Sequence, residues 1–342
     1  SMTFFIGLFY ILLVGLSSQV LADTESSEVA KVLRADSHAP ISIMGDHTHK
    51  ESQVMFSYRF MTMKMDGYQS GSSSSNYTKA RTHSLGGHYM TIPQEMTMNM
   101  HMIGAMYATS DDLTFMVMGS YIDNEMKVIK HTNAKKRTLE SNGFGDTKIA
   151  ILRKLANNDN AKLHATLGLS LPTGSISKKD LMFGTKEETL GYNMQLGSGT
   201  YDVLPGFTYT YSEDTYSYGA QISSVIRVGE NSKEYVLGNI YKSNIWFAVP
   251  FNDKRTSFSL STELKSQGKI RGNHKDIKTI MNFAQNPDSS GSRTIDISLA
   301  INHVFADKIR AGLEYRMPAY NDVNSVQLDT ENTVMFGLGY AY

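Results

Sequence analysis

The sequence lacks cysteine, and it lacks an excess of charge of either sign. The absence of cysteine excludes disulfides and thiolate metal sites, and it suits an oxidising compartment. The 33 basic and 33 acidic residues balance and no basic block stands out, so no nucleic-acid partner is expected. The slightly negative mean hydropathy excludes a bundle of several membrane-spanning helices.

Long apolar runs are also missing, apart from one near the start, Phe4 to Leu16. This run is short for a membrane helix, and Val20 and Ala22 follow it as the small residues of a cleavage site. We predict that residues 1–22 form a signal peptide, with an anchoring helix as the alternative. Residues 23–52 would then be a periplasmic or lumenal segment, either a plug in the lumen or a disordered tether.

The rest of the chain is dominated by alternation of apolar and polar residues. Ile295, Ile297 and Leu299, for example, alternate with Asp296 and Ser298. A period of two indicates strands with one apolar and one polar face, and segments of about ten or more residues can cross a bilayer when tilted. The apolar faces are expected to meet lipid, and the charged faces a wet lumen.

About twelve such segments follow one another, joined in turn by short polar turns and long loops. We predict an all-β fold: a single closed antiparallel transmembrane β-barrel over residues 53–342, with short periplasmic turns and long outer loops. The predicted outer loops are 67–94, 127–142, 172–198 and 268–292. The predicted strands are 53–66, 95–108, 112–126, 143–156, 160–172, 199–211, 215–229, 238–251, 254–268, 293–305, 307–318 and 331–342.

The last segment alternates Phe336, Leu338, Tyr340 and Tyr342 up to the terminal residue of the chain. A terminal aromatic after such alternation resembles the signal that outer-membrane assembly machinery reads. The expected partners are therefore this machinery and outer-membrane lipid, and the expected location is the outer membrane.

Glycine-rich turn motifs recur in a fixed order along the chain: Met44-Gly45-Asp46-His47, Gly143-Phe144-Gly145-Asp146, Leu171-Pro172-Thr173-Gly174, Leu196-Gly197-Ser198-Gly199 and Met317-Pro318-Ala319-Tyr320. In these motifs the chain resembles the outer-membrane transporter family named for the MetA pathway of phenol degradation. The resemblance covers nearly all of the predicted mature chain. It implies a single barrel with a role in solute passage, and it leaves the solute open.

Charged residues on the polar faces are the first candidate site. They would line the lumen, where rings of charge set ion preference, or they would pair across strands to hold a narrow barrel together. The predicted lumen-lining residues are Arg59, Asp146, Lys148, Arg227, Glu263, Lys265, Asp296, Arg310, Glu314 and Arg316.

Methionine and histidine are the second candidate. Thioether and imidazole ligands suit copper, and His47, His49 and His101 are the predicted metal ligands of a copper-handling alternative. The other interpretation places Met96, Met98 and Met100 on the lipid face, with Asn99 and His101 facing the lumen.

Two further functions remain as alternatives. A sealed structural barrel is one. An outer-membrane lipid hydrolase is the other, but Leu139 stands where the histidine of such an enzyme would precede Ser141. We therefore expect a non-enzymatic channel for small solutes, with no cofactor.

The terminal alternation generates the first prediction. Tyr342→Asp should reduce assembly into membranes, because a charge replaces the aromatic end of the predicted targeting strand. Heat-modifiable mobility of the protein in isolated membranes measures assembly, and Tyr342→Phe is the matched control. Equal assembly of both variants would show that the terminal aromatic carries no signal.

Overall fold

The computed structural model describes residues 34–342, except 84, 252, 306 and 307. These residues belong to the second of two compact units, residues 33–342. The predicted signal peptide lies outside the described residues. Within them, no helix is long and apolar enough to cross a membrane.

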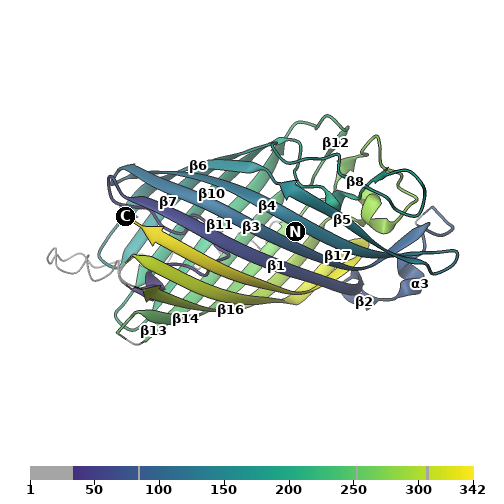
Figure 1. Cartoon of the computed structure of the whole chain (residues 1–342). Coiled ribbons are helices and arrows are strands. Elements are labelled where there is room, and N and C mark those ends of the chain that lie inside the picture. Colours follow the sequence, from purple (N-terminus) through teal and green to yellow (C-terminus); the bar gives the residue numbers. More distant parts are fainter. Residues whose placement is uncertain (1–33, 84, 252, 306–307) are drawn as a thin grey trace. The chain divides into compact units, whose positions relative to one another are not determined.

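One closed antiparallel sheet dominates the described residues (Figure 1). Eleven strands follow one another around it, and the last of them hydrogen-bonds to the first. The strands are β1 (Val54–Gly71), β3 (Thr91–Ser110), β4 (Leu113–Lys130), β6 (Thr147–Asn157), β7 (Ala161–Leu171), β10 (Tyr201–Ser212), β11 (Ser217–Val228), β13 (Ile240–Phe251), β14 (Thr256–Gln267), β16 (Ser292–Phe305) and β17 (Ile309–Ala341). The predicted closed all-β barrel is therefore confirmed.

Strand β17 is unusual because it has 33 residues, and its first and second parts pair with different neighbours. Its first part lies against β16, with Ile309 opposite Phe305 and Val323 opposite Ser292. Its second part lies against β1 as far as Ala341, which is opposite Met55.

Two further strands lie outside the ring but belong to the same sheet. β2 (Ser73–Ser75) pairs with β1, and β5 (Lys136–Phe144) pairs with β4. The sequence assigned 127–142 to an outer loop, but most of it is sheet. Leu139 is buried opposite Met126, so this extension has an apolar inner face of its own.

The connections at one end of the barrel are long and partly ordered. They contain α3 (Tyr77–Ala80), the strand pairs β8 (Lys179–Asp180) with β9 (Glu188–Thr189) and β12 (Tyr235–Val236) with β15 (Arg271–Gly272), and the short 3-10 helices η2 (Tyr192–Met194), η3 (Phe283–Gln285) and η4 (Pro287–Ser289). Met182, Leu190, Met194 and Phe283 of these connections pack on Met96 and Met126 of the barrel. The loops thus share a hydrophobic core with the inner wall.

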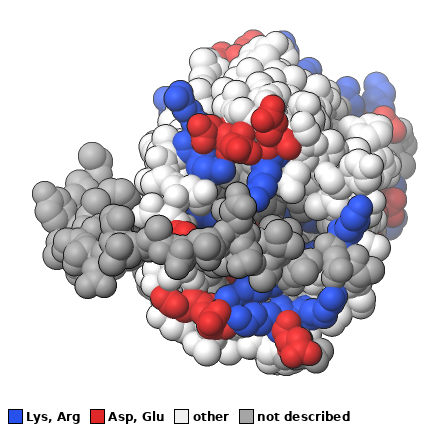
Figure 2. Space-filling model, turned by 90° about the vertical axis from the view of Figure 1, so that its left-hand side faces the viewer, with Lys and Arg blue, Asp and Glu red and all other residues white. Residues whose placement is uncertain are grey.

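The other end has tight turns, such as the one between β3 and β4 and the one between β10 and β11. Acidic and basic side chains lie beside one another at this end (Figure 2). Lys254 pairs with Asp214 here, with 3.0 Å between the nitrogen and the oxygen.

The two faces of the sheet differ as expected for a barrel in lipid. Leu313 is 49% exposed, whereas its neighbour Glu314 is fully buried. Phe258, Leu260 and Leu299 are likewise exposed, while Ser259 and Ser261 are buried. Apolar residues outside and polar residues inside reverse the pattern of a soluble protein.

This pattern predicts the effect of a charge on the outer face. Leu313→Arg should destabilise the protein in bilayers by about 2–4 kcal/mol if the site lies near the midplane. Urea unfolding in liposomes measures the change, and Leu313→Met is the size-matched control. If Leu313→Arg unfolds at the same urea concentration as the control, this face does not meet lipid.

Candidate functional site

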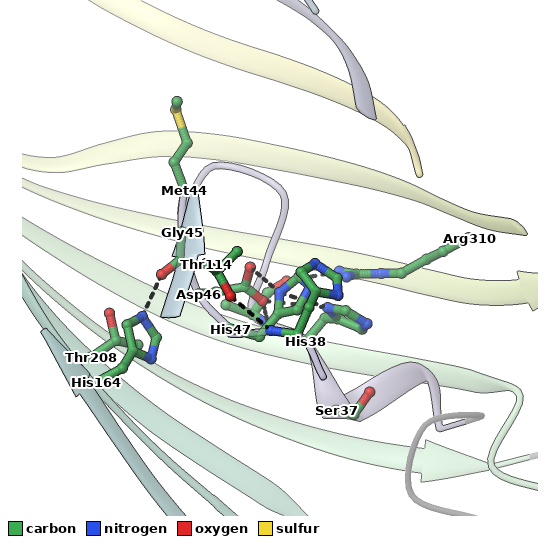
Figure 3. A network of polar contacts seen from close by, with 12 residues as sticks. Ser37, His38, Met44, Gly45, Asp46, His47, Thr114, His164, Thr208 and Arg310 are labelled. Carbon is green, nitrogen blue, oxygen red and sulfur yellow. Dashed lines mark hydrogen bonds and ion pairs between the residues drawn. The ribbon is translucent and has the colours of Figure 1, made fainter. Parts of the chain in front are cut away.

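The segment from Arg34 to Gln53 is here called the inner segment. Its part from Ser37 to His47 lies inside the barrel (Figure 3), and its residues 50–52 are exposed. It begins with η1 (Ala35–Ser37). Strands all around the ring hold it by hydrogen bonds. These are Ser217 Oγ to Asp36 O at 2.8 Å, Arg310 to Ala39 O at 3.0 Å, Ser42 N–H to the Glu314 carboxylate at 2.9 Å, Gln221 to Met44 O at 3.0 Å, His164 Nε2 to Gly45 O at 2.7 Å, and His49 N–H to Thr114 Oγ1 at 3.2 Å.

The local sequence explains the path of the inner segment. The amide of Ile43 donates to the carbonyl of Pro40 at 3.0 Å, and Gly45 has a φ of 62°, which favours glycine. The chain therefore turns back on itself between Pro40 and Gly45.

Two glycines of the barrel wall make room for this turn. A Cβ atom added at Gly312 would lie 2.6 Å from Ile41 Cδ1, and one at Gly337 would lie 2.9 Å from Ile41 Cγ2. Across the lumen, Ala39 and Ile43 pack on Trp246. Ile41 thus sits in a notch that only small wall residues permit.

Most of the predicted lumen-lining charges lie on the inner face, and several pair with one another. Arg227 pairs with Asp202. Arg316 lies 3.2 Å from Glu263 and 3.4 Å from Glu314, and Lys242 lies 3.7 Å from Glu263. Cross-strand register places Lys265 opposite Lys242, Asp296 opposite Glu263 and Lys148 opposite Ser170. These residues of β6 to β17 form what we call the charged wall.

Two of the predicted residues have other surroundings. Asp146 accepts hydrogen bonds from the amides of Gly174 at 2.9 Å and Ser198 at 2.8 Å, so its carboxylate organises the loop ends. Arg59 lines a small cavity together with Ile41, Asp46 and Arg310.

The methionines of β1, β3 and β4 point inward, contrary to their interpretation as a lipid-facing set. Met61 is opposite Met100 and Met63 is opposite Met98, on the same face as Arg59 and its cavity. Ile103 and Tyr107, on the other face of β3, are exposed. The inward methionines, here called the methionine wall, are Met55, Met61, Met63, Met65, Met96, Met98, Met100, Met102, Met106, Met116, Met118, Met126 and Met335.

The predicted metal ligands do not come together as a set. His101 lies on the outer face, with its Nδ1 2.8 Å from the hydroxyl of Tyr58. His47 and His49 lie in the inner segment with ring centroids 4.7 Å apart. Their neighbours His38 and Asp46 were missed as ligands, because the turn that unites them is not a spacing motif.

His38, Asp46 and His47 form a compact polar cluster (Figure 3). Burial lowers the pKa of His38 well below its usual range, and electrostatic interaction with Arg310 acts in the same direction. Burial alone would raise the pKa of Asp46, but interactions with His47 and His38 hold it well below its usual range. Asp46 is therefore a carboxylate at neutral pH.

Ser141, the only serine that the sequence placed near an enzyme-like motif, is buried on the inner face. Its hydroxyl donates to the carbonyl of Met194 at 2.6 Å and accepts from the Asn124 amide at 3.2 Å. Its contacts are those of a structural serine that fastens a loop to the sheet.

No protein-family model and no curated protein matches the sequence. Solved structures match in fold. An outer membrane channel from Pseudomonas putida F1 gives a TM-score of 0.59 at 12% identity, over 88% of this chain and 99% of that chain. The transport unit of the autotransporter AIDA-I from Escherichia coli gives 0.49 at 12% identity, over 92% and 97%. The CymD monoaromatic hydrocarbon channel gives 0.38 at 7% identity, over 86% and 88%.

At 12% identity the likeness to the Pseudomonas channel is one of fold alone. The chain has the fold of an outer-membrane β-barrel, and its apolar outer face suits that membrane. The family resemblance seen in the sequence agrees with the likeness to the Pseudomonas channel, and the family itself stays a prediction.

The notch for Ile41 generates a prediction about the seating of the inner segment. Gly312→Val should displace Ile41 and expose Trp246, because branched carbon atoms would occupy the notch. Trp246 is the only tryptophan, so a red shift of its emission reports the displacement. Gly119→Val is the matched control, since an added Cβ there meets nothing within 4 Å. Unshifted emission from folded Gly312→Val would contradict this seating.

Proposed function

We propose that this protein is an outer-membrane channel through which small solutes pass, and that the inner segment narrows its lumen. The observation that carries the proposal is an inner face with a charged wall, which holds an irregular stretch of chain inside the barrel. A barrel with a purely structural role has no need of such a piece, and irregular backbone at membrane depth is tolerated where it lies inside protein or water.

We also propose that the barrel has twelve passes, because β17 turns back on itself. Val323 lies at the same end as both Ser292 and Gly71, and Ser325 has a φ of 57°. At the other end the amide of Ala341 donates to the carbonyl of Lys308 at 3.1 Å. An even number of passes is usual for bacterial single-chain barrels.

The hydrogen bonds between the inner segment and the barrel wall are weak enough for the segment to move out of the lumen. Neighbouring strands are joined by continuous ladders of backbone hydrogen bonds, whereas the inner segment is held mainly by single bonds to side chains such as Gln221 and Glu314. Each such bond contributes on the order of 1 kcal/mol net. The segment can therefore shift or leave while the ring stays closed.

The two unlike walls point to the class of solute. The methionine wall offers an adaptable, polarisable apolar surface, and the charged wall offers Arg, Lys and carboxylate groups on strands farther along the ring. A small amphiphilic molecule, apolar on one side and polar on the other, fits this pair of surfaces. A soft metal ion such as Cu(I) is the second candidate, which the thioether sulfurs favour.

Hydrolase activity is not proposed. The hydroxyl of Ser141 is committed to Met194 and Asn124, and no histidine is among its hydrogen-bond partners in the part of the chain that the structure describes. We place the protein among channels, without a catalytic role.

Conductance across a planar bilayer tests the channel and the role of the inner segment together. We expect small conductance from the intact protein and a several-fold increase after deletion of residues 34–52. Glu314→Ala, which removes the acceptor for the Ser42 amide, should give a smaller increase and covers the case in which the deletion variant fails to fold. Lys127→Ala is the control, since Lys127 is exposed and pairs with Glu95 away from the lumen.

Two results would overturn the proposal. If intact protein and both lumen variants pass no current, the barrel is sealed and structural. If all conduct equally, the inner segment does not narrow the path.

A further inference from the structure

We infer that the inner segment carries a binding site for a divalent transition-metal ion, formed by His38, Asp46 and His47. The inference concerns the inner segment itself and is independent of which solute the channel carries. Only its last step, the effect on conductance, rests on the proposed function.

Donor atoms from three side chains converge at this place. His38 Nδ1 lies 3.2 Å from His47 Nδ1, and His47 Nδ1 lies 2.8 Å from Asp46 Oδ1. Asp46 Oδ2 lies 3.6 Å from His38 Nδ1. One ligand atom from each residue can be chosen so that all lie within 4.8 Å of one another. Ligands about 2 Å from one central ion lie at comparable mutual distances.

Two ring nitrogens and one carboxylate meet at this place. The two Nδ1 atoms face each other, so one of them must carry the proton between them while both also approach the same carboxylate. A cation bound among them would use the lone pairs of both rings and the charge of Asp46. The hydrogen-bonded cluster without metal is the competing arrangement, and it is an outcome of the test below.

Two ring nitrogens beside the cluster lack hydrogen-bond partners. His49 is buried beside His47, and its Nε2 has no hydrogen-bond partner; the same is true of His47 Nε2. Buried ring nitrogens without partners are costly unless something satisfies them. His49 is not one of the residues whose ligand atoms lie within 4.8 Å of one another, so the ion would be held by His38, Asp46 and His47.

The donor types define the metal. Imidazole nitrogen with one carboxylate suits Zn²⁺, Ni²⁺ and above all Cu²⁺, whereas Mg²⁺ and Ca²⁺ require mostly oxygen ligands. Arg310 lines the same cavity and opposes any cation, so only ions with strong affinity for imidazole should bind.

An ion bound at this site would restrain the turn of the inner segment. His38 and Asp46 flank the turn that places Ile41 in its notch and Ile43 on Trp246. An ion joined to both ends of this turn closes a short loop and limits its movement. Bound metal should therefore hold the inner segment in place and lower the conductance of the channel.

Calorimetric titration of the refolded full chain in detergent tests the site directly. We expect one equivalent of Cu²⁺, and more weakly Zn²⁺ or Ni²⁺, to bind, with no binding of Mg²⁺. All variants should carry His88→Ala and His131→Ala, because that pair, with ring centroids 4.7 Å apart, is a second place for histidine ligation.

In this background, His38→Ala and His47→Ala should each weaken binding at least tenfold. Asp46→Asn should weaken binding as well, and it keeps an oxygen that can accept from the Ala39 amide, as Asp46 does at 2.8 Å. His101→Ala is the control and should leave binding unchanged. Trp246 emission reports whether each variant keeps the inner segment seated.

The outcomes separate the site from the proposed function. Absence of binding to the intact chain, or equal binding by His47→Ala and His101→Ala, would overturn the site and leave a hydrogen-bonded cluster. A different result would keep the site and overturn its effect on the channel. In that case the intact protein binds metal and His47→Ala does not, but metal leaves the conductance of the intact protein unchanged. We expect Cu²⁺ to lower conductance in the intact protein and not in His47→Ala.

Discussion

The structure depends on one constraint: inside a bilayer, every backbone N–H and C=O group needs a partner within the protein. The pairing of β17 with β1 meets this constraint by closing the sheet, so no strand edge is left open to lipid. Closure then divides the side chains into two sets, since successive residues of a strand point to opposite faces. Leu313 outside and Glu314 inside follow directly from that division. The irregular backbone of the inner segment is tolerable because it lies inside the ring.

The same constraint explains how much could be predicted from the sequence. On β14, β16 and the first part of β17, apolar residues alternate with charged ones. The charged residues show which face is wet, because Glu263 and Arg316 cannot face hydrocarbon. Strand β3 has no such charge in its middle, and there the alternation determined which residues share a face but not which face is inside. Thr97 and Asn99 lie opposite Glu125 and Asp123, which are exposed, so this part of the outer face is polar.

The lengths of some strands were underestimated for a related reason. On β4, for example, the predicted strand ended at residue 126, shortly after its outer residues become charged at Asp123. The structure continues β4 to Lys130 and pairs it with β5, because the inner face remains apolar and the loops pack on it. Pairing beyond the apolar outer band is decided by the inner face, which is a core of long-range contacts. Such contacts, Met182 with Met96 and Met126 for example, have no local signature in the sequence.

The polar cluster of the inner segment was only half predictable for a related reason. His47 and His49 are visible as a short motif, whereas His38 reaches them only through the turn between Pro40 and Gly45. That turn is determined by the wall, since Ile41 needs the space left by Gly312 and Gly337, and these residues lie near the other end of the chain. The barrel wall therefore selects the conformation of the inner segment. If the proposed function and the proposed metal site hold, a small region can regulate passage, because the cluster acts on the turn alone while the hydrogen-bonded ring remains unchanged.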